Sequence, residues 1–363
     1  MQFGALRVRG WSKGCEICWK GAKMVLFVTG LCQKYQECPY CTITPWKRER
    51  DIVMADEVLV SSDDDVIREA RLIEALGAGI TGGEPSLFPE RVEKFVRLLK
   101  SEFGADFHIH LYTNSLGVSE ATLAMWADAG LDEIRFHCWD EKGWEKIRLA
   151  VDYGFRVGAE MPSIPGSPWE NRLKDLALFL DRVGAEFLNL NELEFTEGNR
   201  KNLLEMGFRP RPDSEVAAQG SSEAARRVLE FLERETSIWG YFCPAAQKDY
   251  QMWMRWKRRA KNVAKPYESV DESGSLVYGV LKGDSEAISK ALDLLLERGV
   301  PPERISVEEG EVRVAPEAVM DLAELLLEIG VEGGLVEVAP LDERLVLAEY
   351  PLEYLTKRSG KRG

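Results

Sequence analysis

The segment TGLCQKYQECPYC, residues 29–41, decides the fold of the first half of this chain. It directly follows the apolar run Met24–Val28, which predicts a buried strand, and it contains Cys32, Cys38 and Cys41. Three thiolates can hold three irons of a [4Fe–4S] cube and leave the fourth iron open to a ligand. A closed structural metal site needs a fourth ligand close by, and the next cysteine, Cys138, is almost a hundred residues away. The loop therefore predicts an iron–sulfur cluster with one open position.

Composition restricts the class of protein. The 363 residues are 45% hydrophobic and 30% charged, which is typical of a soluble globular protein with room for one large domain and an appendage. The net charge of -14 argues against general coating of nucleic acid. No apolar run approaches the roughly 20 residues that cross a bilayer, and no signal-peptide pattern begins the chain, so we expect a cytoplasmic protein without a membrane span. Seven cysteines, several of them in metal-ligand spacing, also fit a reducing compartment.

Strand and helix patterns alternate from Lys23 to about Glu194 and predict an α/β fold. The strand candidates are short and nearly continuous in apolar residues: Met24–Val28, Ala78–Gly82, Phe107–Tyr112, Glu133–His137, Arg156–Met161 and Glu186–Asn191. The helix candidates have apolar residues at the helical period: Asp65–Leu76, Arg91–Phe103, Glu120–Ala129, Glu141–Tyr153 and Asn171–Val183. Six such units predict a parallel sheet, and because a closed barrel needs eight, we expect an open partial (β/α)6 barrel.

We divide the chain into an N-terminal segment with a cysteine pair (1–22), the partial barrel (23–240), a basic aromatic helix or linker (241–265) and a C-terminal α+β unit (266–363). Within the barrel, a polar segment (198–220), a helix at Glu223–Glu233 and a further strand at Ile238–Phe242 are expected. The basic helix is expected at Ala246–Lys261. The C-terminal unit is predicted to contain Leu276–Val280, Glu286–Arg298, Val312–Val314, Pro316–Ile329 and Leu335–Val338, and the tail 357–363 is expected to be disordered.

A second motif, Thr81-Gly82-Gly83-Glu84-Pro85, stands at the end of the second predicted strand. Active sites of parallel α/β folds gather at this edge of the sheet. Paired glycines allow a ligand to approach the backbone, and an acidic side chain beside them suits a ligand ammonium. By itself the motif also fits a common strand-ending turn with proline, so its weight depends on the cysteine loop.

Together the two motifs resemble the radical S-adenosylmethionine (SAM) superfamily over roughly Lys23–Glu194. The resemblance implies an enzyme in which the open iron binds SAM and a one-electron donor, such as ferredoxin or flavodoxin, drives its cleavage to a 5′-deoxyadenosyl radical that abstracts hydrogen. More narrowly, the chain looks like an archaeal group related to pyruvate formate-lyase activating enzymes. The spacing departs from the commonest family pattern, because five residues instead of three separate Cys32 from Cys38.

The resemblance also implies roles for individual residues. Cys32, Cys38 and Cys41 match the cluster ligands, and Tyr40 matches an aromatic position near the adenosyl group. The remaining positions match SAM-binding segments or lie where such contacts are expected: Thr81, Gly82, Gly83, Glu84, Asn114, Ile164, Gly166, Asn189, Asn191 and Glu192. The alternative for the cysteines is a zinc site completed by a distant ligand. For Asn189, Asn191 and Glu192 the alternative is polar capping of a strand end.

Cys15 and Cys18 form a second two-residue-spaced pair, and with Cys138 and Cys243 they could build a second metal site, zinc or an auxiliary cluster. The alternative is that these thiols are buried and incidental. His108 and His110 alternate along a strand and so face one side, either as substrate contacts or as hydrogen-bonded interior histidines.

The run of residues 253–261 is basic and aromatic, and either contacts RNA or forms an amphipathic helix with packed tryptophans. Lys47, Arg48 and Arg50 carry the same ambiguity. Three function classes remain open: a radical SAM enzyme that modifies RNA or protein, one that acts on a small cofactor or lipid precursor, and a non-catalytic metal-binding protein.

Overall fold

The computed structural model describes residues 2–308 and 310–359, and in this part the chain forms two compact units. The first unit runs to Arg71 and from Ala75 to Gln251. The second contains Leu72–Glu74 and the chain from Met252 onward. Over these described ranges, no helix is long and apolar enough to cross a bilayer.

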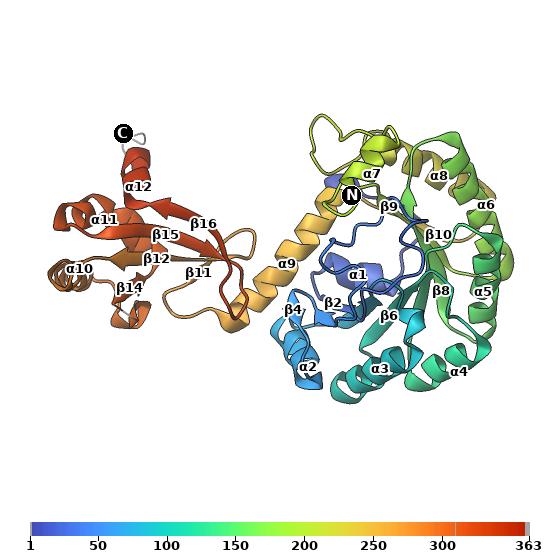
Figure 1. Ribbon diagram of the computed structural model, residues 1–363, viewed down its shortest axis with the longest axis horizontal. Helices are drawn as coiled ribbons and strands as arrows, with labels where there is room; N and C mark the ends of the chain where they lie inside the picture. Colours follow the sequence, from blue (N-terminus) through green and yellow to red (C-terminus); the bar gives the residue numbers. More distant parts are fainter. Residues whose placement is uncertain (1, 309, 360–363) are drawn as a thin grey trace. The chain divides into compact units, whose positions relative to one another are not determined.

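A curved parallel sheet forms the first unit, and Figure 1 looks into its open ring. Its parallel strands lie side by side in chain order: β2 (Lys23–Phe27), β5 (Gly77–Thr81), β6 (His108–Thr113), β7 (Glu133–Phe136), β8 (Arg156–Ser163), β9 (Phe187–Glu192) and β10 (Trp239–Cys243). At the two edges, β1 (Leu6–Val8) pairs antiparallel with β10, while β3 (Met54–Ala55) and β4 (Val58–Leu59) extend the sheet from β2. The predicted open partial barrel is confirmed, with β10 as its further strand.

Helices surround the sheet on its outer side (Figure 1). They are α2 (Asp63–Leu72), α3 (Pro89–Phe103), α4 (Glu120–Ala129), α5 (Glu141–Asp152), α6 (Ser167–Val183) and α8 (Ser221–Glu235). Successive strand residues point to opposite faces, so Leu26, Ile80 and Ile109 are fully buried on the helix side. Strand residues that point to the other face, such as Lys23 and Tyr112, line a cavity inside the ring. The strands are therefore apolar toward the helices and polar toward the lumen.

The N-terminal residues belong to the same unit. After β1, the helix α1 (Lys13–Trp19) lies inside the ring of strands, as Figure 1 shows. Ser12 caps this helix by accepting from the backbone N–H of Cys15. A Cβ added to Gly14 would lie 2.4 Å from Nη2 of Arg135, so α1 packs directly on side chains of the lumen. The sequence predicted neither β1 nor α1, and the polar segment 198–220 also contains the unpredicted helix α7 (Arg200–Glu205).

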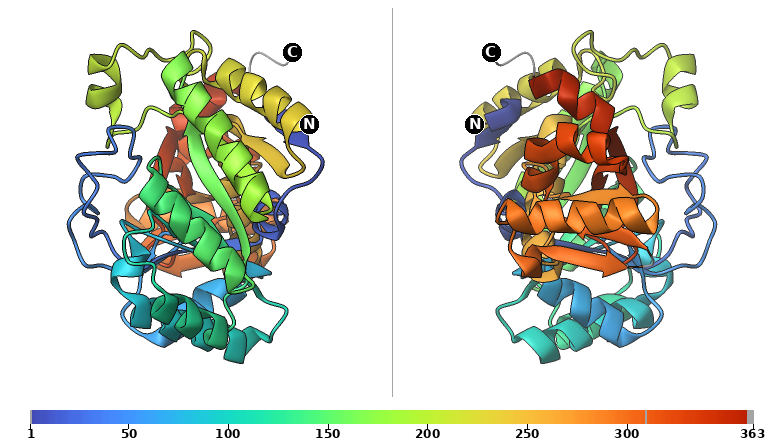
Figure 2. Two further views of the ribbon diagram at one scale, coloured as in Figure 1. Left: turned by 90° about the vertical axis from the view of Figure 1, so that its right-hand side faces the viewer. Right: turned by 90° about the vertical axis from the view of Figure 1, so that its left-hand side faces the viewer.

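The second unit has the order β12 (Leu276–Lys282), α10 (Ser285–Glu297), β13 (Ile305–Glu308), β14 (Glu311–Val314), α11 (Pro316–Ile329) and β15 (Glu332–Val338). The sheet order β13-β14-β12-β15 is that of a split β-α-β unit. Its helices cover one face of the sheet (Figure 2) and pack on Leu281, Val312 and Val314. A strand β16 (Val346–Pro351) adds to β15, and β11 (Ser269–Val270) pairs with β12. The expected α+β unit is present.

The basic helix expected at Ala246–Lys261 is α9 (Ala245–Val263). Arg259 in this helix is only 1% exposed, and its guanidinium donates to the carbonyl of Pro340. Burial removes Arg259 from the basic surface that an RNA contact would need. The tail 357–363 was expected to be disordered, and this was wrong for residues 357–359, which end the helix α12 (Leu352–Ser359). The helix forms because it packs on α11 and β15. Residues 360–363 lie outside the described residues.

Candidate active site

The cysteine loop and the glycine strip are joined backbone to backbone. Past the ends of β2 and β5, the N–H of Val28 donates to the carbonyl of Thr81 at 2.8 Å. The N–H groups of Gly83 and Glu84 then donate to the carbonyls of Thr29 and Leu31, at 2.6 and 2.8 Å. The strand pairing thus continues into both motifs, and this places them over the same end of the lumen.

The two glycines are required by this pairing. A Cβ on Gly82 would lie 2.5 Å from the carbonyl oxygen of Thr29, and one on Gly83 would lie 2.2 Å from that of Leu31. Real Cβ atoms do not approach backbone so closely, so any side chain at these positions would separate the motifs. In the structure the two glycines allow the cysteine loop to approach the strip; the predicted approach of a ligand to this backbone stays a prediction.

Three half-buried thiols stand on that loop. Cys32 Sγ accepts from the backbone N–H of Lys34 at 3.3 Å and from Nδ2 of Asn114 at 3.6 Å. Burial raises the pKa of Cys38 to about 11 and also raises the pKa of Cys32. A bound metal deprotonates such thiols, and hydrogen bonds to a ligating sulfur tune the metal that it holds.

The thiols fit a cluster better than a single ion. Among the described residues, the only group of three His, Cys, Asp or Glu ligand atoms within 4.8 Å of one another is His108, His110 and Glu133. The sulfurs of the loop are more widely spread than the ligands of one zinc ion would be. A polynuclear iron–sulfur cluster spans such a spread, because each thiolate binds a different iron.

Arg48 fastens the far side of the loop. Its guanidinium donates to the carbonyls of Cys41 at 2.8 Å, Ile43 at 3.0 Å and Gly198 at 2.8 Å. Three carbonyls around one cation fix both the loop and the segment after β9. The ambiguity that the sequence left at Arg48 is therefore resolved in favour of a structural contact.

Glu84 braces the neighbouring strand end. Its buried carboxylate accepts from the N–H of Ser86 at 2.9 Å, the hydroxyl of Thr113 at 2.6 Å and the N–H of Asn114 at 2.5 Å. Burial raises the pKa of Glu84, and these hydrogen bonds oppose that rise. The end of β5 is thereby tied to the end of β6, and the carboxyl group is held in one orientation.

Below the loop lies a cavity of about 430 Å³, within the range of small-molecule sites. The predicted residues that line it are Cys32, Cys38, Cys41, Tyr40, Thr81, Gly82, Gly83, Glu84, Asn114, Asn191 and Glu192. Their positions follow from the parallel sheet, because each follows or ends a neighbouring strand. One space therefore collects most of the residues that the two motifs and the strand ends suggested.

Three predicted residues lie elsewhere. Ile164 packs with Tyr40 in a small apolar cluster, and Gly166 precedes α6 with φ of 121°. Asn189 lies deeper in the lumen, where its Nδ2 donates to Cys15 Sγ at 3.3 Å and to Glu160 Oε2 at 3.3 Å. Ile164 supports Tyr40 from behind, and Asn189 belongs to the polar lumen.

Tyr40 is held by two partners. Its hydroxyl accepts from Nε1 of Trp139 at 2.5 Å and lies 3.2 Å from Nε2 of His137. His137 in turn bonds through Nδ1 to the carbonyl of Glu160 at 2.9 Å, and burial lowers its pKa. Trp139 and His137 therefore fix the orientation of the Tyr40 ring within the cysteine loop.

The sequence reading missed the charged groups of the cavity. Lys23, Glu160 and Lys248 line it, and Lys248 pairs with Glu194 at 2.5 Å. Burial alone would raise the pKa of Glu160, but Arg135, at 2.7 Å, lowers it below its usual value. The available signal was a charged residue within an otherwise buried strand, which is rare unless the residue is paired or functional.

The remaining thiols do not form one group. Cys15, Cys18 and Cys243 lie around Tyr241, whereas Cys138 packs against Gly143 at the start of α5. Nδ2 of Asn189 and Nη1 of Arg135 approach Cys15, and Cys18 bonds to Gln251. In the part of the chain that the structure describes, the four thiols therefore do not converge, and a second metal site on Cys15 and Cys18 stays a prediction.

Comparisons with known proteins match this arrangement. The family model of the radical SAM superfamily matches residues 26–138, which contain both motifs. A protein of Methanocaldococcus jannaschii, provisionally named a glycyl-radical enzyme activating enzyme, is 40% identical over 297 residues. The match covers 78% of this chain and 77% of that protein.

Two solved structures also match. SuiB of Streptococcus suis, bound to S-adenosylmethionine, has a TM-score of 0.44 and 13% identity, over 61% of this chain and 50% of SuiB. TsrM of Kitasatospora setae, a radical S-adenosylmethionine methyltransferase, has a TM-score of 0.35 and 12% identity, over 69% of this chain and 56% of TsrM. The chain spans about half the length of these two proteins.

Proposed function

The chain belongs to the radical SAM superfamily and is a radical SAM enzyme, and we propose that Cys32, Cys38 and Cys41 hold its [4Fe–4S] cluster. When bound, the cluster supplies the electron that cleaves SAM into methionine and a 5′-deoxyadenosyl radical. The observation that carries the proposal is the joining of the two motifs, which sets three thiols and the glycine strip over one cavity.

The chain's own residues bind and orient SAM in this proposal. The strip Thr81–Glu84 receives the methionyl amine, and the carboxylate of Glu84, held by its hydrogen bonds, favours that cation without moving. Tyr40, fixed by Trp139 and His137, takes the adenosyl group, with Asn114 and Asn191 as polar contacts. The half-buried loop leaves the thiols accessible to a ferredoxin or flavodoxin as electron donor.

As substrate we propose a glycine residue of a partner protein. The radical would take a hydrogen atom from the glycine Cα, giving 5′-deoxyadenosine and a glycyl radical. The name of the Methanocaldococcus jannaschii relative supports this choice. A buried Arg259 speaks against the alternative of an RNA substrate gripped by α9.

A second candidate is a small polar metabolite. The charges of Lys23, Glu160, Lys248 and Glu194 at the cavity favour it, since a glycine backbone carries no charge for them to bind. These lining groups pair with one another in the structure, and each could exchange its present partner for a charged group of a ligand. The two candidates differ in the source of the abstracted hydrogen.

Anaerobically reconstituted protein with dithionite and SAM tests the reaction class. We expect release of methionine and 5′-deoxyadenosine, lost in Cys38→Ser and kept in Cys243→Ser, which removes a thiol outside the loop. Cleavage that survives Cys38→Ser contradicts the ligand assignment.

Deuterium transfer separates the two substrates. The source organism is grown on Cα-deuterated glycine, and its proteins are extracted and dialysed. When these proteins are incubated with the reconstituted enzyme and SAM, we expect deuterium to be transferred into 5′-deoxyadenosine. Transfer from a deuterated small-molecule fraction alone contradicts the protein substrate and supports the metabolite.

A further inference from the structure

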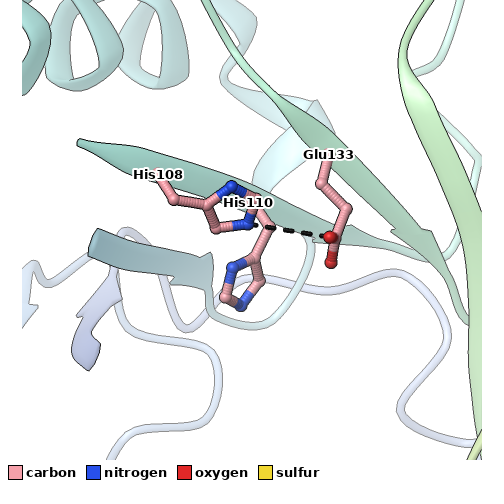
Figure 3. A group of neighbouring side chains, drawn as sticks. All are labelled: His108, His110 and Glu133. Carbon is pink, nitrogen blue, oxygen red and sulfur yellow. Dashed lines mark ion pairs between the residues drawn. The ribbon is translucent and has the colours of Figure 1, made fainter. Parts of the chain in front are cut away.

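A second cluster of possible metal ligands lies at the opposite end of the lumen, where β6 and β7 begin. Figure 3 shows His108 and His110 side by side on one strand, with Glu133 facing them from the next. Nε2 of His108 is 3.6 Å from Oε2 of Glu133, and ligand atoms of all three residues lie within 4.8 Å of one another. About 2 Å separates a zinc ion from each nitrogen or oxygen ligand, so 3.6 Å suits two ligands of one ion.

The three side chains are buried without hydrogen-bond partners at the atoms that would ligate. His110 and Glu133 are 0% exposed and His108 is 7% exposed. In the described structure, Nε2 of His108, both ring nitrogens of His110 and Oε2 of Glu133 have no partner. Buried polar groups are almost always hydrogen-bonded, so several unpartnered atoms facing one another call for an explanation.

Arg135 holds Glu133 as an outer contact of a metal site does. Arg135 binds Oε1 of Glu133 at 2.6 Å and leaves Oε2 free. Oδ2 of Asp132 lies 3.9 Å from Nδ1 of His108, beyond hydrogen-bond distance, and accepts instead from Nζ of Lys100 and the N–H of Ile109. A donor behind a ligating carboxylate is a usual second contact of a metal ligand.

We propose that His108, His110 and Glu133 bind one divalent transition-metal ion of the Zn²⁺ type. Two imidazoles and one carboxylate suit such borderline ions. The ion would join β6 to β7 beneath α1, about 13 Å along β6 from Thr113 at the cluster end. This places it at the amino-terminal face of the strands, where buried residues of a barrel serve stability. Its role is therefore structural, and it differs from the thiol site suggested for Cys15 and Cys18.

Cobalt titration tests the site in the full-length chain. The variant Cys32→Ser/Cys38→Ser/Cys41→Ser, stripped with a chelator, removes competition from the cluster ligands. We expect one equivalent of Co²⁺ to bind, with visible d–d absorption and no thiolate charge-transfer band. Glu133→Gln and His108→Asn should each weaken binding at least tenfold, because each removes a ligand.

His137→Asn is the matched control, because the chain has three histidines and this one contacts Tyr40 near the cysteine loop. It should bind Co²⁺ with unchanged affinity. A thiolate charge-transfer band, no binding by the folded protein, or unchanged affinity in Glu133→Gln overturns the proposal.

Zinc X-ray absorption gives a test without substitutions that could unfold the protein. The intact, cluster-loaded chain carries iron in its cluster, so the zinc edge reports on zinc alone. After incubation with Zn²⁺ and gel filtration, we expect one retained zinc with imidazole and oxygen ligands at about 2.0–2.2 Å. Sulfur at about 2.3 Å, or no retained zinc, overturns the site.

Discussion

Buried polar groups are hydrogen-bonded at one end of the lumen and lack hydrogen-bond partners at the other end, among the residues that the structure describes. At the carboxyl ends of β5 and β6, the Glu84 carboxylate has three donors, and the cysteine loop is held by backbone hydrogen bonds. At the amino ends of β6 and β7, His108, His110 and Glu133 are as deeply buried but keep unpartnered atoms. An unpartnered buried polar group costs about 1–3 kcal/mol. One end is therefore organised before any ligand arrives, and the other would be completed by one.

The largest effect is expected at the amino end. Arg135→Met should lower the free energy of unfolding by about 3–5 kcal/mol, because Glu133 and Glu160 would stay buried without their cation. Urea denaturation at neutral pH measures this loss. Arg97→Met removes an equally charged side chain from surface pairs with Glu93 and Asp128 and should change little. Equal losses in the two variants would remove the contrast between buried and exposed charge.

At the carboxyl end, packing should dominate over charge. Gly83→Ala should cost about 1–3 kcal/mol, because its methyl group would overlap the backbone of Leu31. It should also lower the iron bound after reconstitution, since the loop must move away from the strip. The control Gly283→Ala meets its nearest atom, a methyl group, at 3.2 Å. Full iron loading in Gly83→Ala would show that the joined motifs are not needed for the cluster.

A smaller effect should follow from loosening the loop. Arg48→Met removes hydrogen bonds to three carbonyls and should cost roughly 1.5 kcal/mol. Iron content should fall less than in Gly83→Ala, because the strip still pairs with the loop. Arg50→Met, at a neighbouring exposed position, provides the comparison. An identical iron content in both variants would argue that Arg48 only fills space.

The smallest effect concerns pH. Because the folded protein holds the pKa of Glu160 below its usual value, ionised Glu160 stabilises the fold above that usual value. This contribution disappears as the pH falls through the lowered pKa. Glu160→Gln should therefore lose less stability than the parent chain between pH 7 and acid pH, as measured by urea midpoints. An unchanged or steeper acid loss in the variant would contradict the pairing of Glu160 with Arg135.

Sequence patterns predicted the helices and strands of the barrel better than the side chains that line its lumen. Helix α4 (Glu120–Ala129) agrees at both ends with its prediction, because Ser119 and Gly130 cap it with strong local signals. The strands β1 and β16 were missed because β1 has only three residues and β16 is an edge strand that is almost wholly exposed, so neither carries a pattern of buried residues. Residues such as Lys23 and Glu160 gave no periodic signal, since each is a single polar residue in a buried strand.

What the sequence determined by itself was the family and the barrel, because cysteine spacing, the glycine strip and period-2 and period-3.6 apolar patterns are local properties of the chain. Only the tertiary structure decided which side chains meet. It placed Asn189 beside Cys15, gave Glu84 its three donors and faced Glu133 toward two histidines. The contact of Asn189 depends on where α1 packs inside the ring, and that of Glu133 depends on the register of parallel strands 20 or more residues apart in sequence, which packing of the whole sheet sets.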